Sequence, residues 1–293
     1  METIITTDSG TNPRVMDNMV PCTVIDGNGN NYCDMRKIDS NKKVINNSEV
    51  LERAVSGERF HTASPTIGDY DLLMRKHLNK GCNIIHLSMS NGISAGSVNA
   101  SRLIGEILND EYGDDRVTVI DTLTAGCGGT VINDYANDLV KQGLPTKEIV
   151  KKLEEVKSKI LATFYISKVE GFANSGRAPK EVKLSDKLAF RYRVDINDKG
   201  KLFPKLPIYR GNIKDAFMKY LKRLINENNV HEFDPNYLAF LITRLDEINL
   251  EEAKDYIRSL NYFKEENIQE LEFYSAICSY GVIDQVGIGL IKK

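Results

Sequence analysis

The sequence contains no tryptophan, only four histidines and only five cysteines among its 293 residues. The cysteines are odd in number, form no Cys-x-x-Cys pair and lie near no pair of histidines; they are Cys22, Cys33, Cys82, Cys127 and Cys278. We therefore expect free thiols in a reducing compartment, and neither a disulfide framework nor a structural zinc site. The sequence predicts no metal and no other cofactor.

Long apolar runs are also missing. No stretch approaches the roughly 18 consecutive apolar residues of a transmembrane helix. The N-terminus carries Glu2 and Asp8 where a signal peptide would carry basic residues. The net charge of −2 gives no reason to expect nucleic acid or an anionic membrane as a partner. These absences predict a cytoplasmic protein without an integral membrane segment, with a monomer as the default oligomeric state.

The first half of the chain repeats one pattern three times: an apolar strand, a polar loop and a helix. This order indicates a parallel sheet with right-handed crossovers. The expected strands cover residues 3–7, 83–88 and 117–120. One expected helix covers 68–78, a second follows the small-residue loop 90–97 and ends near Leu108, and a third follows the glycine-rich loop 126–129 and ends near Val140. Before the second strand, residues 23–26 and 32–35 are predicted to form a hairpin, and Ser48 is predicted to cap a short helix.

The pattern changes after Gly143-Leu144-Pro145. A charged helix is expected from Thr146, its predicted cap, to about Lys159. The following segments alternate in the way that is typical of a mixed or antiparallel sheet. The expected strands cover 163–167, 188–196, 201–204, 237–243 and 272–278, and the expected helices cover 213–226 and 250–260. At 293 residues a split into two lobes is common, and we place the boundary near residue 160, giving lobes of 1–160 and 161–293.

Hydroxyl and carboxyl side chains gather where the expected strands end. In open parallel sheets, ligands bind at the carboxyl ends of the strands, near a topological switch point. Free N–H groups at the starts of the following helices favour an anion there, such as a carboxylate or phosphate. Ser and Thr are also the preferred helix caps, but their repetition at successive strand ends favours a site. The set comprises Asp8, Ser9, Thr62, Ser64, Ser90, Ser94, Asp121 and Thr122.

The motifs of the common enzyme classes are missing. There is no G-x-x-x-x-G-K-[ST] phosphate loop, no G-x-G-x-x-G after a strand and no G-x-S-x-G. His86 lies inside an apolar strand and is interpreted as structural, although it could act as a base for Ser88 or Ser90. His61, beside Thr62, is the better candidate to line a site. An enzyme that acts on a small carboxylated or phosphorylated substrate through His61 or Asp8 therefore stays open as an alternative.

The order and spacing of these segments resemble the DegV family, the bacterial fatty-acid-binding proteins that present acyl chains to a fatty acid kinase. The similar segments run in order along nearly the whole chain. They are Thr7-Asp8-Ser9 (T-D-S in the family), Thr62-Ala63-Ser64-Pro65 (T-S-x-P), Ser90 to Gly96 (S-S-x-L-S-G-T), Ile120-Asp121-Thr122 (I-D-S), Gly176-Arg177 (G-R) and Tyr209-Arg210-Gly211 (R-G).

The resemblance implies two α/β lobes, the first doubly wound and flavodoxin-like, the second a mixed sheet with helices on one side. It also implies a lipid carrier of phospholipid synthesis, not an enzyme. A long-chain fatty acid would lie in a buried tunnel, and its burial at about 0.8 kcal/mol per CH₂ would supply most of the affinity. The carboxylate would be held by Thr62 and Ser94, with Ser64, Ser90 and Asn91 as neighbours.

The same resemblance implies a partner. A fatty acid kinase would phosphorylate the bound carboxylate, and Arg177 and Arg210 would face that kinase or the acyl phosphate, because Arg reads phosphate in bidentate fashion.

The C-terminal segment departs from the family, which has G-x-H-x-G-P-G there with the His near the ligand head. Residues 279–290 of this chain contain no His and no Gly-Pro-Gly. A lost charge-assisted hydrogen bond of roughly 1.5–3 kcal/mol would shift the affinity about tenfold or more. We therefore expect a divergent paralogue that binds another acyl chain, binds more weakly or does not couple to a kinase. A degenerate protein, in which Val282 or Tyr280 closes the head site, is the remaining alternative.

Overall fold

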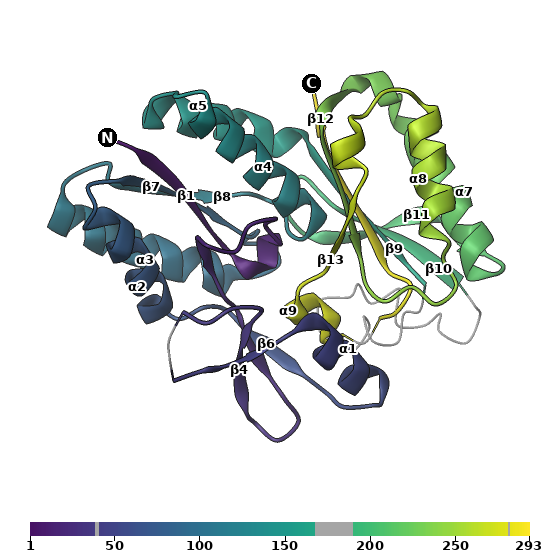
Figure 1. Cartoon of the computed structure of the whole chain (residues 1–293), viewed down its shortest axis with the longest axis horizontal. Helices are drawn as coiled ribbons and strands as arrows, with labels where there is room; N and C mark the ends of the chain where they lie inside the picture. Colours follow the sequence, from purple (N-terminus) through teal and green to yellow (C-terminus); the bar gives the residue numbers. More distant parts are fainter. Residues whose placement is uncertain (39–40, 168–189, 281) are drawn as a thin grey trace.

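The computed structural model describes residues 1–38, 41–167, 190–280 and 282–293 (Figure 1). Strands in these ranges form three sheets. Two large sheets lie side by side with helix α4 between them, and a small sheet lies below the first (Figure 1). The predicted two-lobed α/β architecture is confirmed.

The first large sheet is parallel and has the strand order β2-β1-β7-β8. Helices α2 and α3 cover one face, and α4 and α5 cover the other (Figure 1). Ile84, Ile85 and Leu87 on β7 are fully buried, as expected for a strand covered on both faces. The elements are β1 (Thr3–Asp8), β2 (Met19–Val20), β7 (Asn83–Ser88), β8 (Val117–Asp121), α2 (Ile67–Leu78), α3 (Ala95–Tyr112), α4 (Cys127–Lys141) and α5 (Thr146–Val156).

The second large sheet is mixed and has the strand order β11-β10-β9-β14-β12-β13. Its neighbours are antiparallel except β12 and β13, which run parallel. Helices α7 and α8 pack on the face away from α4 (Figure 1). The elements are β9 (Ile160–Ile166), β10 (Phe190–Ile196), β11 (Leu202–Arg210), β12 (Phe233–Ile242), β13 (Glu270–Glu272), β14 (Val286–Lys292), α7 (Ile213–Asn228) and α8 (Leu250–Ser259).

The third sheet is small and has the strand order β5-β4-β3-β6. The predicted hairpin is confirmed, because β3 and β4 pair antiparallel. Thr62 lies on β6, opposite Val24 of β3, so it is not at the end of a parallel strand as the sequence suggested. The elements are β3 (Thr23–Ile25), β4 (Asn31–Asp34), β5 (Lys43–Ile45), β6 (His61–Ala63) and helix α1 (Asn47–Val55). Short 3₁₀ turns cover Ser9–Thr11, Lys157–Lys159, Val230–Glu232 and Glu265–Asn267.

The strand predicted at 272–278 is wrong. That stretch holds the end of β13 and helix α9 (Ser275–Cys278), whereas β14 was missed. Gly287 and Gly289 weaken the strand signal in the sequence of β14. A Cβ at Gly289 would lie 2.1 Å from the backbone oxygen of Cys127. The glycine is therefore required by the close approach of the first turn of α4 to β14.

Two predicted helix caps are also wrong. Helix α1 is capped by Asn46, whose side-chain oxygen accepts the Glu49 N–H at 2.8 Å, and not by Ser48. Helix α5 follows Pro145, and the Thr146 hydroxyl lies 2.8 Å from that of Thr3 instead of capping the helix. At α1 the neighbouring Asn46 accepts the first-turn N–H in place of Ser48. At α5 the Thr146 hydroxyl bonds the distant Thr3 hydroxyl in place of a first-turn N–H.

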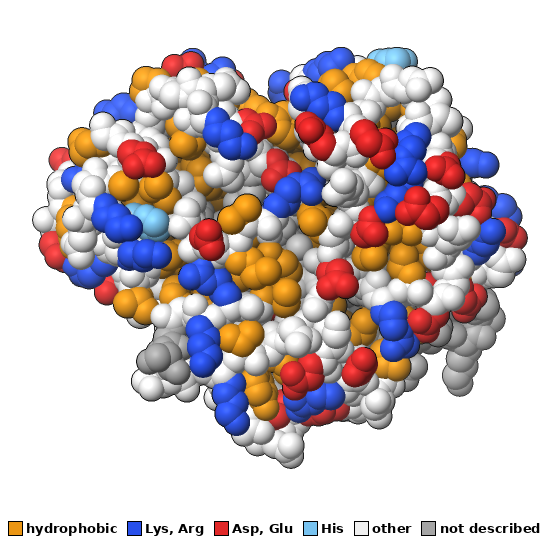
Figure 2. All heavy atoms as spheres, viewed as in Figure 1, with side chains coloured by type: hydrophobic (Ala, Val, Ile, Leu, Met, Phe, Trp, Pro, Cys, Tyr) orange, Lys and Arg blue, Asp and Glu red, His pale blue; other side chains and the backbone are white. Residues whose placement is uncertain are grey.

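The surface mixes charges of both signs, and Figure 2 shows Lys and Arg side chains interspersed with Asp and Glu over the viewed face. This agrees with the near-neutral net charge. No helix in the described ranges is long and apolar enough to cross a membrane. The parallel sheet changes to the mixed sheet at Ile160. The division into domains at residue 160 stays a prediction, because one apolar cluster joins both large sheets.

Candidate functional site

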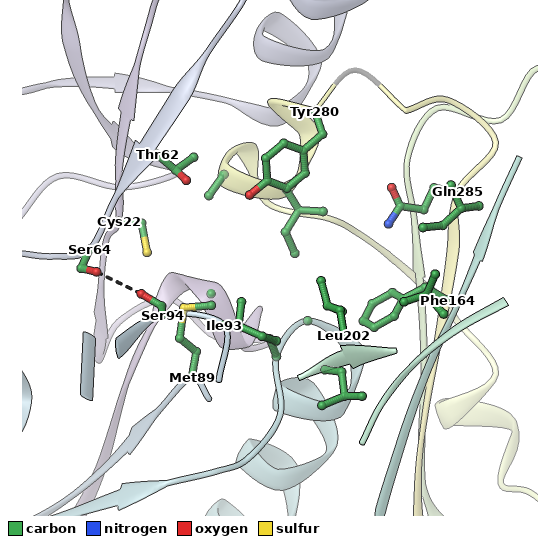
Figure 3. Close-up of a pocket in the computed structure, with 18 of the residues that line it drawn as sticks. Cys22, Thr62, Ser64, Met89, Ile93, Ser94, Phe164, Leu202, Tyr280 and Gln285 are labelled. Atoms are coloured by element: carbon green, nitrogen blue, oxygen red, sulfur yellow. Dashed lines mark hydrogen bonds between the residues drawn. The ribbon is translucent and has the colours of Figure 1, made fainter. Parts of the chain in front are cut away.

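A cavity lies where the three sheets meet (Figure 3). It has about 860 Å³ of empty space, part of which is open to solvent. Gly10 follows β1 and Met89 follows β7, and both line it. Strand order reverses between β1 and β7, so the cavity opens at the switch point that the sequence analysis expected for a ligand.

Ser94 immediately precedes α3 but does not cap it. Its hydroxyl forms no cap bond and instead lies 3.0 Å from the Ser64 hydroxyl and 3.0 Å from the Ser97 hydroxyl. Figure 3 shows the Ser64–Ser94 bond at one side of the cavity. The first turn of the 18-residue helix therefore has no side-chain acceptor. Its N–H groups and helix dipole favour an anion beside Ser94.

Thr62 faces the same cavity from β6. Its side chain is half-buried, and no described residue forms a hydrogen bond to its hydroxyl. In Figure 3 it lies on the same side as Ser64 and Ser94. The structure thus brings together three of the predicted residues, one from a small-sheet strand, one from the loop after it and one from the start of α3.

Ser90 and Asn91 do not line the cavity, although both were predicted as neighbours of the ligand. The buried Ser90 hydroxyl donates to the Gly200 carbonyl at 2.7 Å and accepts the Gly92 N–H at 3.0 Å. Asn91 is exposed, and its N–H donates to Asp121 at 3.2 Å. The turn between β10 and β11 docks on this loop and takes up the Ser90 hydroxyl, which explains the difference.

Of the two predicted arginines, Arg210 is outside the cavity lining. Arg177 lies outside the described residues. Arg210 is exposed at the end of β11, where it pairs with Phe190, whereas Leu202 at the start of β11 pairs with Ile196 and lines the cavity. Phe190 and Ile196 are six residue steps apart along β10, so the two pairs are separated by roughly 20 Å at about 3.3 Å per step. The partner-facing role of Arg210 stays a prediction.

The acid–base candidates do not face the cavity. His61 is exposed and outside the lining. The His86 ring is buried, its Nδ1 lies 3.0 Å from the Thr6 hydroxyl, and burial lowers its pKa to about 3. Asp8 is buried behind the cavity wall and accepts the Met89 N–H at 2.9 Å. Burial raises its pKa to about 7. The enzyme alternative predicted a polar, water-filled cleft and a perturbed titratable group, with His61 or Asp8 as the acid or base. The pKa of Asp8 is perturbed, but the cavity lining is mostly apolar and includes neither residue.

The rest of the cavity is formed by side chains that the sequence analysis did not identify. Strands β9 and β10 contribute alternate residues, and alternation on one face of a strand is the signal that could have marked them. The apolar set is Phe164, Ile166, Val194, Ile196, Leu202, Ala276 and Ile277. In Figure 3, Phe164 lies on the opposite side from the hydroxyls.

The altered C-terminal segment contributes Tyr280 and Gln285 to the lining. The Tyr280 hydroxyl points into the cavity, which stays open beside it (Figure 3). Val282 is buried and outside the lining. Asp284 has φ 51° and accepts the backbone N–H groups of residues 246, 247 and 248 at 2.9–3.1 Å, so it fixes a neighbouring loop. Neither Val282 nor Tyr280 closes the cavity, contrary to the degenerate alternative.

Metal ligands are not gathered in the described ranges, which hold no group of three or more His, Cys, Asp or Glu side chains suited to an ion. The site is thus a mostly apolar cavity with the hydroxyls of Thr62, Ser64 and Ser94 and a helix start without a side-chain cap at one side, and with the Tyr280 hydroxyl pointing into it.

Comparison with protein families gives one match over nearly the whole chain. A family model described as "Uncharacterised protein, DegV family" matches residues 17–293. Curated DegV domain-containing proteins are also similar. One from Clostridium perfringens is 27% identical over 52% of this chain and 53% of its own length. YteA from Lactococcus lactis is 24% identical over 68% of this chain and 66% of its own length. The chain thus spans about half to two thirds of these relatives.

Solved structures share the fold over the full chain. A DegV family protein from Thermus thermophilus, described by its fatty acid binding, has a TM-score of 0.82 and 20% identity, with 100% of both chains covered. A stearic-acid-binding protein from Eubacterium ventriosum has a TM-score of 0.80 and 17% identity, with 99% and 98% covered. The Streptococcus pneumoniae Fatty Acid Kinase (Fak) B3 protein, loaded with linoleic acid, has a TM-score of 0.78 and 21% identity, with 100% of both covered.

Proposed function

We propose that this chain, which belongs to the DegV family, is a carrier that binds one long-chain fatty acid and presents its carboxylate to a fatty acid kinase. Thr62 and Ser94 hold the carboxylate, and Ser64 positions the Ser94 hydroxyl. The acyl tail fills the apolar part of the cavity. The chain itself supplies binding and orientation, and the kinase supplies the phosphoryl chemistry.

The observation that carries this proposal is the Ser94 hydroxyl. A serine at a helix start normally accepts a backbone N–H of the first turn. The Ser94 side chain does not, although the Ser94 carbonyl accepts the Ser97 N–H at 3.2 Å. The helix start thus lies beside a hydroxyl pair and beside Thr62, whose hydroxyl has no partner among the described residues. A carboxylate would accept bonds from the hydroxyls and be favoured by the helix dipole. A neutral, purely apolar ligand would use none of these groups.

The apolar lining supports the tail half of the proposal. Burying about 15 CH₂ groups at about 0.8 kcal/mol each gives roughly 12 kcal/mol before the entropic costs of binding. The head contributes less energy but fixes the orientation. Two hydroxyls leave one face of the carboxylate open to attack a phosphoryl donor.

The similar solved structures support the ligand class and the partner. The protein from Thermus thermophilus is described by its fatty acid binding, that from Eubacterium ventriosum binds stearic acid, and that from Streptococcus pneumoniae is loaded with linoleic acid. One of them is a Fatty Acid Kinase (Fak) B3 protein, which is why we propose a kinase as the partner of this chain.

Lipid extraction from the purified native protein, followed by mass spectrometry, tests the ligand. We expect a stoichiometric long-chain fatty acid. The absence of any fatty acid, together with no thermal shift on adding oleate or palmitate, would overturn the proposal.

Substitution of Ser94 by alanine tests the head site. Hydrogen bonds to a charged group contribute roughly 1.5–3 kcal/mol, so Ser94→Ala is expected to weaken oleate binding about 10- to 150-fold in a titration. Ser158→Ala, which removes an exposed hydroxyl of a 3₁₀ turn, is the matched control and should leave the affinity unchanged. Equal affinities for Ser94→Ala and the parent protein would exclude Ser94 from the head site.

The carrier role has a separate test. Protein loaded with radiolabelled oleate and given ATP and Mg²⁺ should form no acyl phosphate alone, and should form it when a DegV-associated fatty acid kinase is added. Acyl phosphate formation without the kinase would favour the enzyme alternative.

A further inference from the structure

Gln285 places a carboxamide inside the apolar part of the cavity. The residue precedes β14, is 7% exposed and belongs to the cavity lining. Figure 3 shows its carboxamide pointing into the cavity beside Phe164, on the side opposite Thr62, Ser64 and Ser94. Besides the hydroxyls of Thr62, Ser64, Ser94 and Tyr280, the cavity therefore has a polar group on its far side, with Ile93 and Leu202 between this group and the serines.

The carboxamide has no hydrogen-bond partner among the described residues, although the backbone of Gln285 is fully used. The Gln285 N–H donates to the Thr243 hydroxyl at 3.1 Å, and the Gln285 carbonyl accepts the Thr243 N–H at 3.1 Å. These bonds to the end of β12 hold the Gln285 backbone in place and direct its side chain to the cavity. The side chain is thus a fixed polar group that faces the ligand space.

A plain hydrocarbon tail would leave this carboxamide without a partner. Burying a polar group without a hydrogen bond costs free energy, and an apolar residue of the same size would avoid that cost. A hydroxyl oxygen on the tail would accept from the amide N–H₂ and could donate to the amide oxygen. Sites with a buried polar group of this kind discriminate against ligands that lack the matching group.

We propose that the cavity selects long-chain acids that carry a hydroxyl or keto oxygen along the chain, with Gln285 as the specificity-determining residue. This inference rests on the proposed function, because it assumes that the carboxylate lies at Thr62 and Ser94. It goes further by naming the class of acyl chain.

Competition between octadecanoic acid and a panel of hydroxyoctadecanoic acids, with the hydroxyl at carbon 9, 10 or 12, tests the inference on the parent protein. The affinities are measured by displacement of a fluorescent fatty acid. We expect at least one isomer to bind about 3- to 10-fold more tightly than octadecanoic acid, since one net hydrogen bond distinguishes them. Equal or weaker binding of every hydroxylated isomer would overturn the inference.

Gln285→Met and Gln285→Leu then locate the effect. Methionine has nearly the length of glutamine without its donors, and leucine is a second replacement should one variant fold poorly. Either variant should bind octadecanoic acid at least as tightly as the parent and lose the preference for the hydroxylated acid. A preference that survives both substitutions would also overturn the inference.

Thr62→Val is the matched control at the other side of the cavity. It should weaken both acids by the same factor and keep their ratio, which separates the head site from the tail site. Failure of all the acids to bind the parent protein would overturn the proposed function and this inference together. Binding of all of them with the same affinity would overturn this inference alone.

Discussion

Ser94 and Ser90 lie in one loop, yet their hydroxyls have different tasks. Ser90 is fully buried and bonds the turn between β10 and β11 through the Gly200 carbonyl. Ser94 bonds Ser64 at the cavity and leaves the start of α3 uncapped. At the scale of single residues, the fold therefore uses the Ser90 hydroxyl for an internal hydrogen bond and places the Ser94 hydroxyl at the cavity.

Asp8 is a buried carboxyl that the proposed carrier does not use. It accepts hydrogen bonds from the Met89 N–H and the Ser88 hydroxyl, but burial dominates and raises its pKa to about 7. The pKa in the unfolded chain is about 3.9. The neutral acid is thus favoured in the folded protein. Its stabilising contribution is fully present below about pH 4 and is lost as the pH rises through about 7.

Asp8→Asn removes this titration, and we expect it to change the pH dependence of stability. The free energy of unfolding of the variant should exceed that of the parent by up to about 4 kcal/mol at pH 8, and the difference should fall to near zero by pH 4. Urea unfolding at one-unit steps between pH 4 and 8 measures it. Asp34, whose pKa burial raises to about 6, is present in both proteins and cancels. A difference that does not vary with pH would contradict the raised pKa of Asp8.

At the scale of elements, the sequence predicted the parts of the fold whose signals are local. The parallel strands and their helices follow from apolar runs and polar loops, and they were placed within a few residues. The antiparallel strands β9, β10 and β11 were also found, with the turn before Gly200. These elements are long enough for their periodicity to appear in the sequence.

The elements that were missed depend on contacts between distant residues. Strand β14 contains two glycines because α4 packs against its backbone, and that contact is invisible in a single sequence. Strand β6 has three residues and pairs with β3, about 38 residues earlier in the chain by the Thr62–Val24 pairing. Such a short strand carries no period, so the sequence predicted Thr62 at the end of a parallel strand, whereas the structure places it on a strand of the small sheet that lines the cavity.

Arg193 on β10 illustrates how a fully buried charge is held within these elements. Its guanidinium bonds both carboxylate oxygens of Asp195 at 2.8 and 3.0 Å and bonds Glu227 of α7 at 2.9 Å. Its side chain is 2% exposed. The two carboxylates raise its pKa against the effect of burial. The cluster links the outer face of the mixed sheet to the helix that covers it.

Arg193→Met should therefore destabilise the protein strongly. Removing Arg193 leaves the buried Asp195 carboxylate with only the Lys205 ammonium, 3.6 Å away, and breaking a buried pair in this way typically costs about 3–5 kcal/mol. Arg223→Met is the matched control, because Arg223 pairs with the same Glu227 at the surface, where a pair contributes less than about 0.5 kcal/mol. Urea unfolding at pH 7 compares the two variants. Equal effects would show that the Arg193 cluster is solvated and adds little.

At the scale of the whole molecule, the cavity belongs to both lobes. Gly10, Thr62 and Ser94 come from the first 160 residues, whereas Phe164 and Gln285 come from the rest. Contacts between these halves include α4 against strands of both large sheets, α9 against α1, and the turn at Gly200 against the Ser90 loop. A ligand that fills this cavity would touch both halves and so add a further connection.

The site could be predicted only in part, because residues from both halves of the chain form it. The hydroxyls at Thr62, Ser64 and Ser94 stood out in the sequence, since polar residues after apolar strands are a local signal. Gln285 did not stand out in the sequence, because a single glutamine before a glycine-containing strand forms no recognisable sequence pattern. Its position in the cavity follows from pairing between β14, β12 and β9. The apolar part of the cavity lining likewise depends on which face of each strand points inward where the sheets meet.

We expect the two lobes to unfold as one cooperative unit, because a single apolar cluster runs from Ile5 in β1 to Ile291 in β14. Calorimetry should give one transition with equal calorimetric and van't Hoff enthalpies. Oleate at 100 times its Kd should stabilise the whole transition by about 2.7 kcal/mol and move its midpoint upward. Ser94→Ala should keep the single transition and show a smaller shift at the same oleate concentration. Two resolved transitions, with only one moved by oleate, would instead show that the halves divided near residue 160 fold independently and that the ligand is held by one of them.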